Sequence, residues 1–173
     1  MAGKTDYLND PNAPAPNSIK PAANVAVLND AAELLLIRRA DNGNYALPGG
    51  AMDFGESLTE TAIRECREET GYEIEIDGLV GVFTNPGHVV HYNSNNEVRQ
   101  EFAVVYHGHL TGGAAKHNDE ATEIIWVPLP QAADLEPMHD SMRYRIAVFA
   151  KGELPHLDRP HDISGFLRAR SED

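Results

Sequence analysis

The chain has 173 residues, the size of a single domain, and 42% of them are hydrophobic, which is sufficient for a buried core. The formal net charge is −13 and Lys and Arg form no cluster, which argues against bulk nucleic acid as a partner. No apolar run approaches the ~20 residues of a membrane span, and the N-terminus does not have the pattern of a signal peptide. The single cysteine, Cys66, excludes an internal disulfide and suits a reducing compartment, so we expect a cytoplasmic protein.

The first elements are expected soon after the N-terminus. Residues 1–20 are rich in Pro, Asn and Ala, so we expect a flexible arm there. Residues 24–28 and 33–39 are β-type runs separated by an Asn-Asp turn, a pattern typical of a hairpin. Residues 41–55 carry prolines and glycines at a density that argues against a helix or a central strand, so we expect a loop.

A helix is predicted next, because residues 57–60 form a capping box and Gly71 can end the helix that follows. The later strands are expected at residues 73–84, 98–110 and 124–129, and the later helices at 130–135 and 139–151. Residues 153–173 are polar, and we expect a loosely ordered tail. The pattern predicts an α/β fold, a sheet with a few helices packed on it, in one domain over residues 21–152.

Three glutamates of the predicted helix oppose the rules for helix stability. Glu65, Glu68 and Glu69 stand at i, i+3 and i+4, so their carboxylates converge on one side of the helix. Like charges at this spacing destabilise a helix by about 0.2–0.5 kcal/mol per pair, and acids in the last turns oppose the helix dipole. The alternative is a solvated acidic face, but local rules are broken mainly at functional sites. Since carboxylate oxygens hold hard dications, the cluster predicts a divalent metal site.

Residues around the three glutamates can organise them. Arg64 lies four residues after Glu60 and four before Glu68, and its rigid guanidinium can orient carboxylates. Glu56 precedes the helix and can either join the acidic cluster or interact with the helix N-terminus, and the sequence leaves both open. Cys66 falls on the apolar face of the helix, so we expect a core residue and not a nucleophile.

Residues 50–72 match the Nudix box, which is Gly, five residues, Glu, seven residues, then Arg-Glu-apolar-any-Glu-Glu-any-Gly-apolar. The fixed positions are all filled, by Gly50, Glu56, Arg64, Glu65, Glu68, Glu69 and Gly71. Cys66 and Tyr72 are mild departures at the two apolar positions. The chain therefore resembles the Nudix hydrolases, strongly at the box and loosely over about residues 21–150. The resemblance implies an α/β/α sandwich around a central mixed sheet, with the box as its loop–helix unit.

The resemblance also implies a mechanism, which is metal-dependent hydrolysis of a pyrophosphate bond with Mg²⁺, and with Mn²⁺ as a substitute. Glu68 and Glu69 would be the first metal ligands, and Glu65 a further ligand or the general base. The main-chain carbonyl of Gly49 would be an added ligand, and Arg64 would orient the glutamates without touching the substrate.

Two residues outside the box are further candidates. Some family members take the general base from a later loop, and Glu120 is the candidate for that role here. The alternative is that Glu120 is simply an exposed acid of the loop. Arg39 resembles the arginine that contacts a phosphate at the end of a family strand. Arg38 is expected to face the surface, because neighbouring residues of a strand point to opposite faces.

The histidines suggest a zinc site, which we do not predict. His88 and His91, and His107 and His109, have short spacings, but neither pair shows the further ligands that close a tetrahedral site. Residues 91–96 form a polar loop that could line a cleft and affect specificity.

The substrate is the least determined part of the function. We expect a small-molecule nucleotide, with ADP-ribose or a nucleoside diphosphate sugar favoured and nucleoside triphosphates next. Asn85-Pro86-Gly87 lies near the proline of ADP-ribose hydrolases, one residue out of place, and is equally a plain turn. A catalytically silent nucleotide-binding or sensor module is the alternative, but it predicts lost box acids and none is lost. No membrane partner is expected, and the oligomeric state stays open, a homodimer included.

Overall fold

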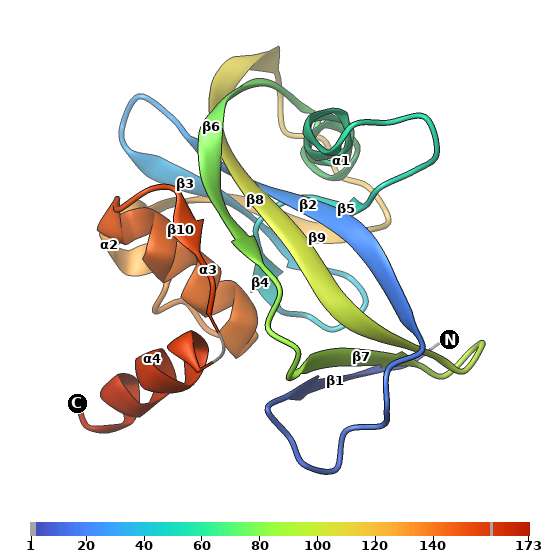
Figure 1. The fold of residues 1–173 in the computed structure, drawn as a ribbon. Coiled ribbons are helices and arrows are strands. Elements are labelled where there is room, and N and C mark those ends of the chain that lie inside the picture. The colour runs from blue at the N-terminus through green and yellow to red at the C-terminus, as the bar shows by residue number, and fades with distance from the viewer. Residues whose placement is uncertain (1–2, 160) are drawn as a thin grey trace.

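The computed structural model describes residues 3–159 and 161–173, and a curled mixed sheet forms its centre (Figure 1). Helix α1 lies on one face of the sheet, and the later helices lie on the other. The strands are β1 (Lys4–Leu8), β2 (Ser18–Leu28), β3 (Glu33–Arg39), β4 (Tyr45–Ala46), β5 (Gly49–Ala51), β6 (Tyr72–Phe83), β7 (His88–Tyr92), β8 (Glu97–Gly113), β9 (Ala121–Pro128) and β10 (His156–Leu157). The helices are α1 (Leu58–Thr70), α2 (Leu129–Ala132), α3 (Asp140–Lys151) and α4 (Asp162–Ser171).

The long parallel pair β2 and β8 forms the middle of the sheet, and the other large pairings are antiparallel. On the far side of β8, β7 pairs with its beginning and β6 with the rest. β3 turns back from β2 through Asn29, whose side-chain oxygen accepts the N–H groups of Ala31 and Glu33. The expected hairpin is present, and β9 pairs with β3 on its outer side.

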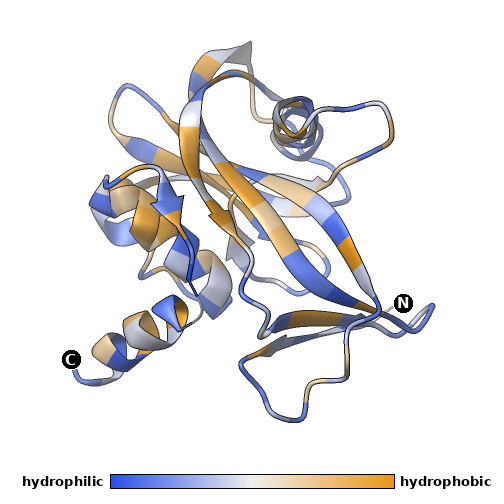
Figure 2. Ribbon diagram, in the orientation of Figure 1, coloured by the Kyte–Doolittle hydropathy of each residue, from blue (hydrophilic) through white to orange (hydrophobic). Residues whose placement is uncertain are grey.

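Alternate residues of β2 and β3 point to opposite faces, and both faces are covered. Val25, Val27 and Leu35 pack under α1 against Ala62 and Cys66. The other face packs against α3 and α4, and the residues buried there include Ala26, Leu34, Leu36, Ile146 and Ile163. Figure 2 shows the hydrophobic residues concentrated on the long central strands. Burial on both faces explains why these strands read as nearly continuous apolar runs.

Helix α1 begins and ends where the sequence predicts. The Ser57 side chain accepts the Glu60 N–H, and the Glu60 carboxylate accepts the Ser57 N–H at 2.7 Å, which completes the capping box. Gly71 ends the helix in the left-handed conformation, with φ 83°. Cys66 is 0% exposed, so it is the core residue that was expected.

Regular structure is present in four segments where the sequence predicts none, and one of them is β7. In the expected arm, β1 pairs with β7 from Lys4↔Tyr92 to Leu8↔His88. In the expected tail, β10 pairs with β6 at Gly81, and α4 follows it. In the expected 41–55 loop, β4 and β5 pair with β3 and β2. The arm and tail carry few apolar residues, and tertiary contacts decide their structure. Within residues 3–159 and 161–173, no helix is long and apolar enough to cross a membrane.

Candidate active site

A cleft of about 330 Å³ lies between the box helix and the β1–β7 edge of the sheet. Carboxylates from α1 and from the loop before β9 line one end of the cleft. Its remaining wall mixes cationic, acidic and amide side chains, which are Lys4, Asp6, Asn24, Arg39, Asn42, Asn44, Arg99, Glu101 and Arg145.

Glu65, Glu69 and Glu120 bring carboxylate oxygens to within 4.8 Å of one another in this cleft. Glu69 is only 4% exposed, and its Oε2 accepts the Gly49 N–H at 3.0 Å. Burial raises the pKa of Glu69 to about 8, and the nearby Glu65 carboxylate adds to the shift. Burial also raises the pKa of Glu65, although Arg64 opposes it. Close, buried carboxylates of this kind repel one another, and a divalent cation among them would remove the repulsion, so the donor set fits such an ion.

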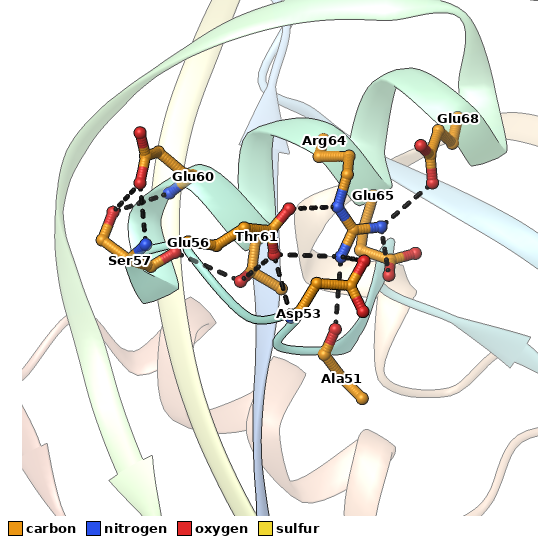
Figure 3. Close-up of polar contacts among 9 residues, drawn as sticks. All are labelled: Ala51, Asp53, Glu56, Ser57, Glu60, Thr61, Arg64, Glu65 and Glu68. Atoms are coloured by element: carbon orange, nitrogen blue, oxygen red, sulfur yellow. Dashed lines mark hydrogen bonds and ion pairs between the residues drawn. The ribbon is translucent and has the colours of Figure 1, made fainter.

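Arg64 holds the acidic helix face and the box loop together (Figure 3). Its guanidinium donates to Glu56, to Glu65 at 2.8 Å and to Glu68 at 3.0 Å, and it reaches the Ala51 carbonyl oxygen at 3.2 Å. A rigid donor fork satisfies several acceptors at fixed angles. Arg64 therefore contacts the glutamates that the resemblance implies it orients, and that role stays a prediction.

Glu56 binds Arg64, and Glu60 forms the predicted capping box. Glu56 accepts bonds from Arg64, from the Thr61 hydroxyl at 2.8 Å and from the Asp53 N–H at 3.1 Å. Arg64 lowers the pKa of Glu56 to about 2, so the carboxylate stays ionised. Glu56 thus anchors Arg64 and is not one of the three clustered acids. Glu60 bonds to Ser57 in the capping box instead of binding Arg64.

Glu68 lies outside the three-acid cluster. Its side chain is 51% exposed, and Arg64 Nη1 lies 3.0 Å from Glu68 Oε2. The adjacent Glu69 is directed into the cleft. The role of Glu68 as a metal ligand stays a prediction, because it requires the carboxylate to share or leave Arg64.

The glycines of the box loop permit a close approach of backbone to the acids. A Cβ atom on Gly50 would lie 2.5 Å from Oε1 of Glu65. A Cβ atom on Gly49 would lie 2.2 Å from the carbonyl oxygen of Ala23, in the strand that pairs with β5. Gly49 has no space for a side chain because backbone faces it, whereas a side chain at Gly50 would displace the Glu65 carboxylate.

Asn118 positions Glu120, and sequence reasoning missed it. Its Nδ2 donates to the Glu69 carbonyl oxygen at 2.6 Å, and its Oδ1 accepts the N–H groups of Glu120 and Ala121, both at 2.9 Å. One side chain thereby joins the end of α1 to the loop that carries Glu120. An asparagine beside a candidate acid is the only signal in the sequence, and it is too common to be specific.

Arg39 lines the cleft, while Arg38 pairs with Glu123 at 2.9 Å and does not line it. Arg39 makes two bonds to Asp41, at 2.9 and 2.7 Å, and Lys4 reaches the same carboxylate at 3.3 Å. Lys4 comes from the segment expected to be a flexible arm, so nothing in the sequence predicts its position here.

The two histidines of each pair singled out by spacing have separate surroundings. His88 lies with Asp6 and His139, and the ligand atoms of these three residues are within 4.8 Å of one another. His88 is buried, and its Nε2 lies 3.4 Å from Asp6, while His91 lies outside the cleft lining. His107 stacks on an aromatic ring of α3, and His109 binds an aspartate of β6. His88 to Tyr92 is strand β7, so only the later part of the expected 91–96 loop is a turn.

Residues 18–149 match the family model of the NUDIX domain, and this match covers most of the chain. The chain belongs to the Nudix family. It is 31% identical over 159 residues to a MutT-like protein of Streptomyces ambofaciens, covering 90% of this chain and 93% of that relative. It is 36% identical to a putative 8-oxo-dGTP diphosphatase of Bacillus subtilis (60% of this chain, 62% of the relative). It is 31% identical to an ADP-ribose pyrophosphatase of Methanocaldococcus jannaschii (64% and 63%), so the match spans less than two thirds of the latter two relatives.

Solved structures agree with this assignment. A MutT protein from Methanosarcina mazei superposes with a TM-score of 0.63 at 25% identity, covering 79% of this chain and 96% of that one. An ADP-ribose pyrophosphatase from Streptococcus suis shares the fold, with a TM-score of 0.60 at 21% identity, over 80% and 96% of the two chains. The predicted family, mixed-sheet fold and enzyme class are confirmed. This Nudix hydrolase is a pyrophosphohydrolase, and Nudix hydrolases generally use divalent metal ions.

Proposed function

We propose that this Nudix hydrolase cleaves the pyrophosphate bond between a nucleoside diphosphate and a second moiety, with Mg²⁺ as the working ion and Mn²⁺ as a substitute. ADP-ribose or a nucleoside diphosphate sugar is the preferred substrate, ahead of nucleoside triphosphates. The convergence of Glu65, Glu69 and Glu120 in the cleft carries the proposal of a metal-dependent reaction.

Glu65, Glu68, Glu69 and the main-chain carbonyl of Gly49 would hold the divalent ion, with Glu120 close to it. When bound, the ion neutralises phosphate charge and lowers the pKa of a coordinated water. Arg64 keeps the box acids in place, and Arg39 contacts a phosphate from the opposite wall.

Glu120 is the proposed general base, in preference to Glu65. Oε1 of Glu65 accepts a hydrogen bond from Arg64 at 2.8 Å, and Glu65 is also a proposed metal ligand, so its oxygens are already engaged. The Glu120 carboxylate has neither a hydrogen bond nor an ion pair to any described residue. A carboxylate that is free and adjacent to the metal ligands can accept the proton of the attacking water.

The charges of the cleft wall support the preferred substrate class. Asp41 engages both Arg39 and Lys4, Arg99 bonds to Glu97 at 3.0 Å, and Arg145 lies 3.8 Å from Glu101. These internal partners leave little uncompensated positive charge for the additional phosphate of a triphosphate. Asp6 and Glu101 also bring carboxylate oxygens to the cleft, and besides the Arg145 contact of Glu101 these oxygens have lone pairs that suit the hydroxyl groups of ribose or another sugar. The name of the M. jannaschii relative points the same way, and that of the B. subtilis relative points to triphosphates.

A substrate panel with Mg²⁺ tests the proposal. ADP-ribose, nucleoside diphosphate sugars and canonical and oxidised nucleoside triphosphates are incubated with wild type and with Glu69→Gln. Two phosphomonoesters, which release phosphate only after alkaline phosphatase, are expected from the preferred class. Release of pyrophosphate, detected with inorganic pyrophosphatase, would indicate hydrolysis of a nucleoside triphosphate. A higher kcat/KM for a nucleoside triphosphate than for ADP-ribose and the nucleoside diphosphate sugars would overturn the substrate assignment. Wild type that turns over nothing in the panel would favour a silent binding module.

A further inference from the structure

A further group of potentially metal-ligating side chains lies away from the cleft, in the C-terminal segment. His156 is on β10, Asp158 follows that strand, and Asp162 is in the first turn of α4. Their ligand atoms lie within 4.8 Å of one another. None of the three lines the active-site cleft, and all lie beyond residues 18–149, the part matched by the family model.

Asp158 is a buried carboxylate without sufficient partners. Its side chain is 4% exposed, and its Oδ1 has no hydrogen-bond partner in residues 3–159 and 161–173. A buried charge is strongly unfavourable unless it is paired or coordinates a metal. In the described part of the chain, no Lys or Arg forms an ion pair with Asp158 or with Asp162. The one imidazole of His156 faces both, with Nε2 at 3.9 Å from an oxygen of each.

The surroundings fix the direction of these groups. The His156 ring stacks on Phe83 with the centroids 5.6 Å apart, and its Nε2 lies 3.0 Å from the Tyr144 hydroxyl. Asp162 Oδ2 accepts the Arg159 N–H at 2.9 Å, which holds that carboxylate beside His156. One imidazole nitrogen, two carboxylates and a phenol oxygen therefore converge on a small volume.

We propose that His156, Asp158 and Asp162 bind a divalent transition-metal ion, for which Zn²⁺ is the matching ion, and that this ion fastens the C-terminal segment to the core. Imidazole nitrogen with aspartate oxygens is a ligand set that zinc accepts, whereas Mg²⁺ prefers oxygen alone. The Tyr144 hydroxyl or a water molecule would complete the coordination.

The site is accessible and connects several elements. A cavity of about 480 Å³ is lined by Tyr144, His156 and Asp162 and gives an ion a path from solvent. The ligands come from β10, the loop after it and α4, and Tyr144 comes from α3. An ion here would add a link between parts of the chain that already pack together, for example through Tyr144 and Phe166, whose ring centroids are 5.4 Å apart.

Zinc binding by the full-length protein tests the proposal. Metal-stripped wild type, Asp158→Asn and Asp162→Asn are dialysed against Zn²⁺ with excess Mg²⁺ present to occupy the Nudix site. Wild type is expected to bind one zinc ion more per chain than either variant, with affinity lowered at least about 10-fold by each substitution. Glu153→Gln is the matched control, because it removes a carboxylate from the lining of the same cavity without removing a proposed ligand. It should bind zinc like wild type.

Thermal unfolding and proteolysis separate metal binding from loss of fold. Without metal, Asp158→Asn should be at least as stable as wild type, because the unpaired buried charge is gone. With Zn²⁺, the unfolding temperature of wild type should rise, residues 153–173 should become protected from protease, and Asp158→Asn should show neither change. Equal zinc binding or equal stabilisation of the two proteins would overturn the proposal. Mg²⁺-dependent hydrolysis should be the same in Asp158→Asn and wild type, so this result stands apart from the proposed function.

Discussion

At the scale of single residues, Glu69 has the environment that most requires a cation. Its carboxylate is buried near Glu65 and Glu120, with the Gly49 N–H as its hydrogen-bond donor. Burial and like charges both disfavour ionisation, which explains why its pKa is raised to about 8. A bound divalent ion, as proposed, would compensate for a carboxylate that is locally unfavourable at this position.

The stability of the metal-free protein should therefore fall as the pH rises. The Glu69 carboxyl loses its proton at about pH 8 in the folded state and near pH 4.5 in the unfolded chain. The free energy of unfolding is therefore highest below pH 4.5 and falls as the pH rises from 4.5 to about 8. Thermal unfolding in EDTA should show a Tm lower by several degrees at the upper end of this window, since about 1 kcal/mol shifts Tm by about 2–4 °C. Mg²⁺ should restore the loss, most strongly at high pH.

Glu69→Gln is the control for this effect. It cannot ionise, so the fall in Tm between the two pH values should be smaller and the Mg²⁺ response weaker. An unchanged pH slope in Glu69→Gln would show that another group is responsible.

Glu120→Gln tests the assignment of the general base. The variant should lower kcat by about 100-fold or more, the usual contribution of a positioned base, while its apparent Mg²⁺ affinity falls less than in Glu69→Gln. Steady-state kinetics at several Mg²⁺ concentrations make the comparison. Asp119→Asn is the matched control, because it changes the exposed acid next to Glu120, and its kcat should equal that of wild type. The assignment fails if Glu65→Gln loses kcat and Glu120→Gln does not.

At the scale of elements, the active site depends on how a loop is attached to a helix. The end of α1 and the loop before β9 are joined by backbone bonds such as Lys116 N–H to the Thr70 carbonyl at 2.9 Å, and by the side chain of Asn118. This attachment sets the distance of Glu120 from the box acids.

Asn118→Ala should release that loop. The substitution removes the hydrogen bond to the Glu69 carbonyl oxygen and the acceptor of the Glu120 and Ala121 N–H groups. The free energy of unfolding should therefore fall by about 1–3 kcal/mol, and kcat should also fall. Denaturant unfolding and kinetics measure both. Asn118→Asp keeps the acceptor and should recover part of kcat, and His117→Ala, in an exposed neighbour, should change little. Full activity in Asn118→Ala would exclude a positioning role.

At the scale of the whole molecule, the cleft is completed by chain segments far from the box. β1 pairs along β7 and so carries Lys4 and Asp6 into the wall opposite α1. Lys4 shares Asp41 with Arg39, so the N-terminal strand and the predicted phosphate contact belong to one charged group.

Lys4→Ala should weaken substrate binding more than turnover. Without Lys4, Asp41 holds Arg39 more strongly and one cation of the wall is lost, so KM should rise several-fold while kcat changes less. Lys20→Ala removes an exposed lysine outside the cleft lining and is the matched control. If Lys4→Ala has the KM of wild type, Lys4 of β1 does not contribute to substrate binding.

The sequence by itself determined the features that depend on residues close together in the chain. The capping box, Gly71 and the apolar stripe through Cys66 define α1, because helix limits and faces follow from local hydrogen bonds and a fixed period. The same period predicted that box glutamates converge, and the spacing of the box identified the family.

Tertiary structure alone decided which distant groups join these features. It directed Glu69 into the cleft and left Glu68 with Arg64, made Asn118 the support of Glu120, and brought Lys4 to Asp41. It also assembled His156, Asp158 and Asp162 next to β6, in a segment that composition alone describes as a polar tail. The physical reason is that these contacts depend on strand register and on packing between segments far apart in the chain, which no local pattern encodes.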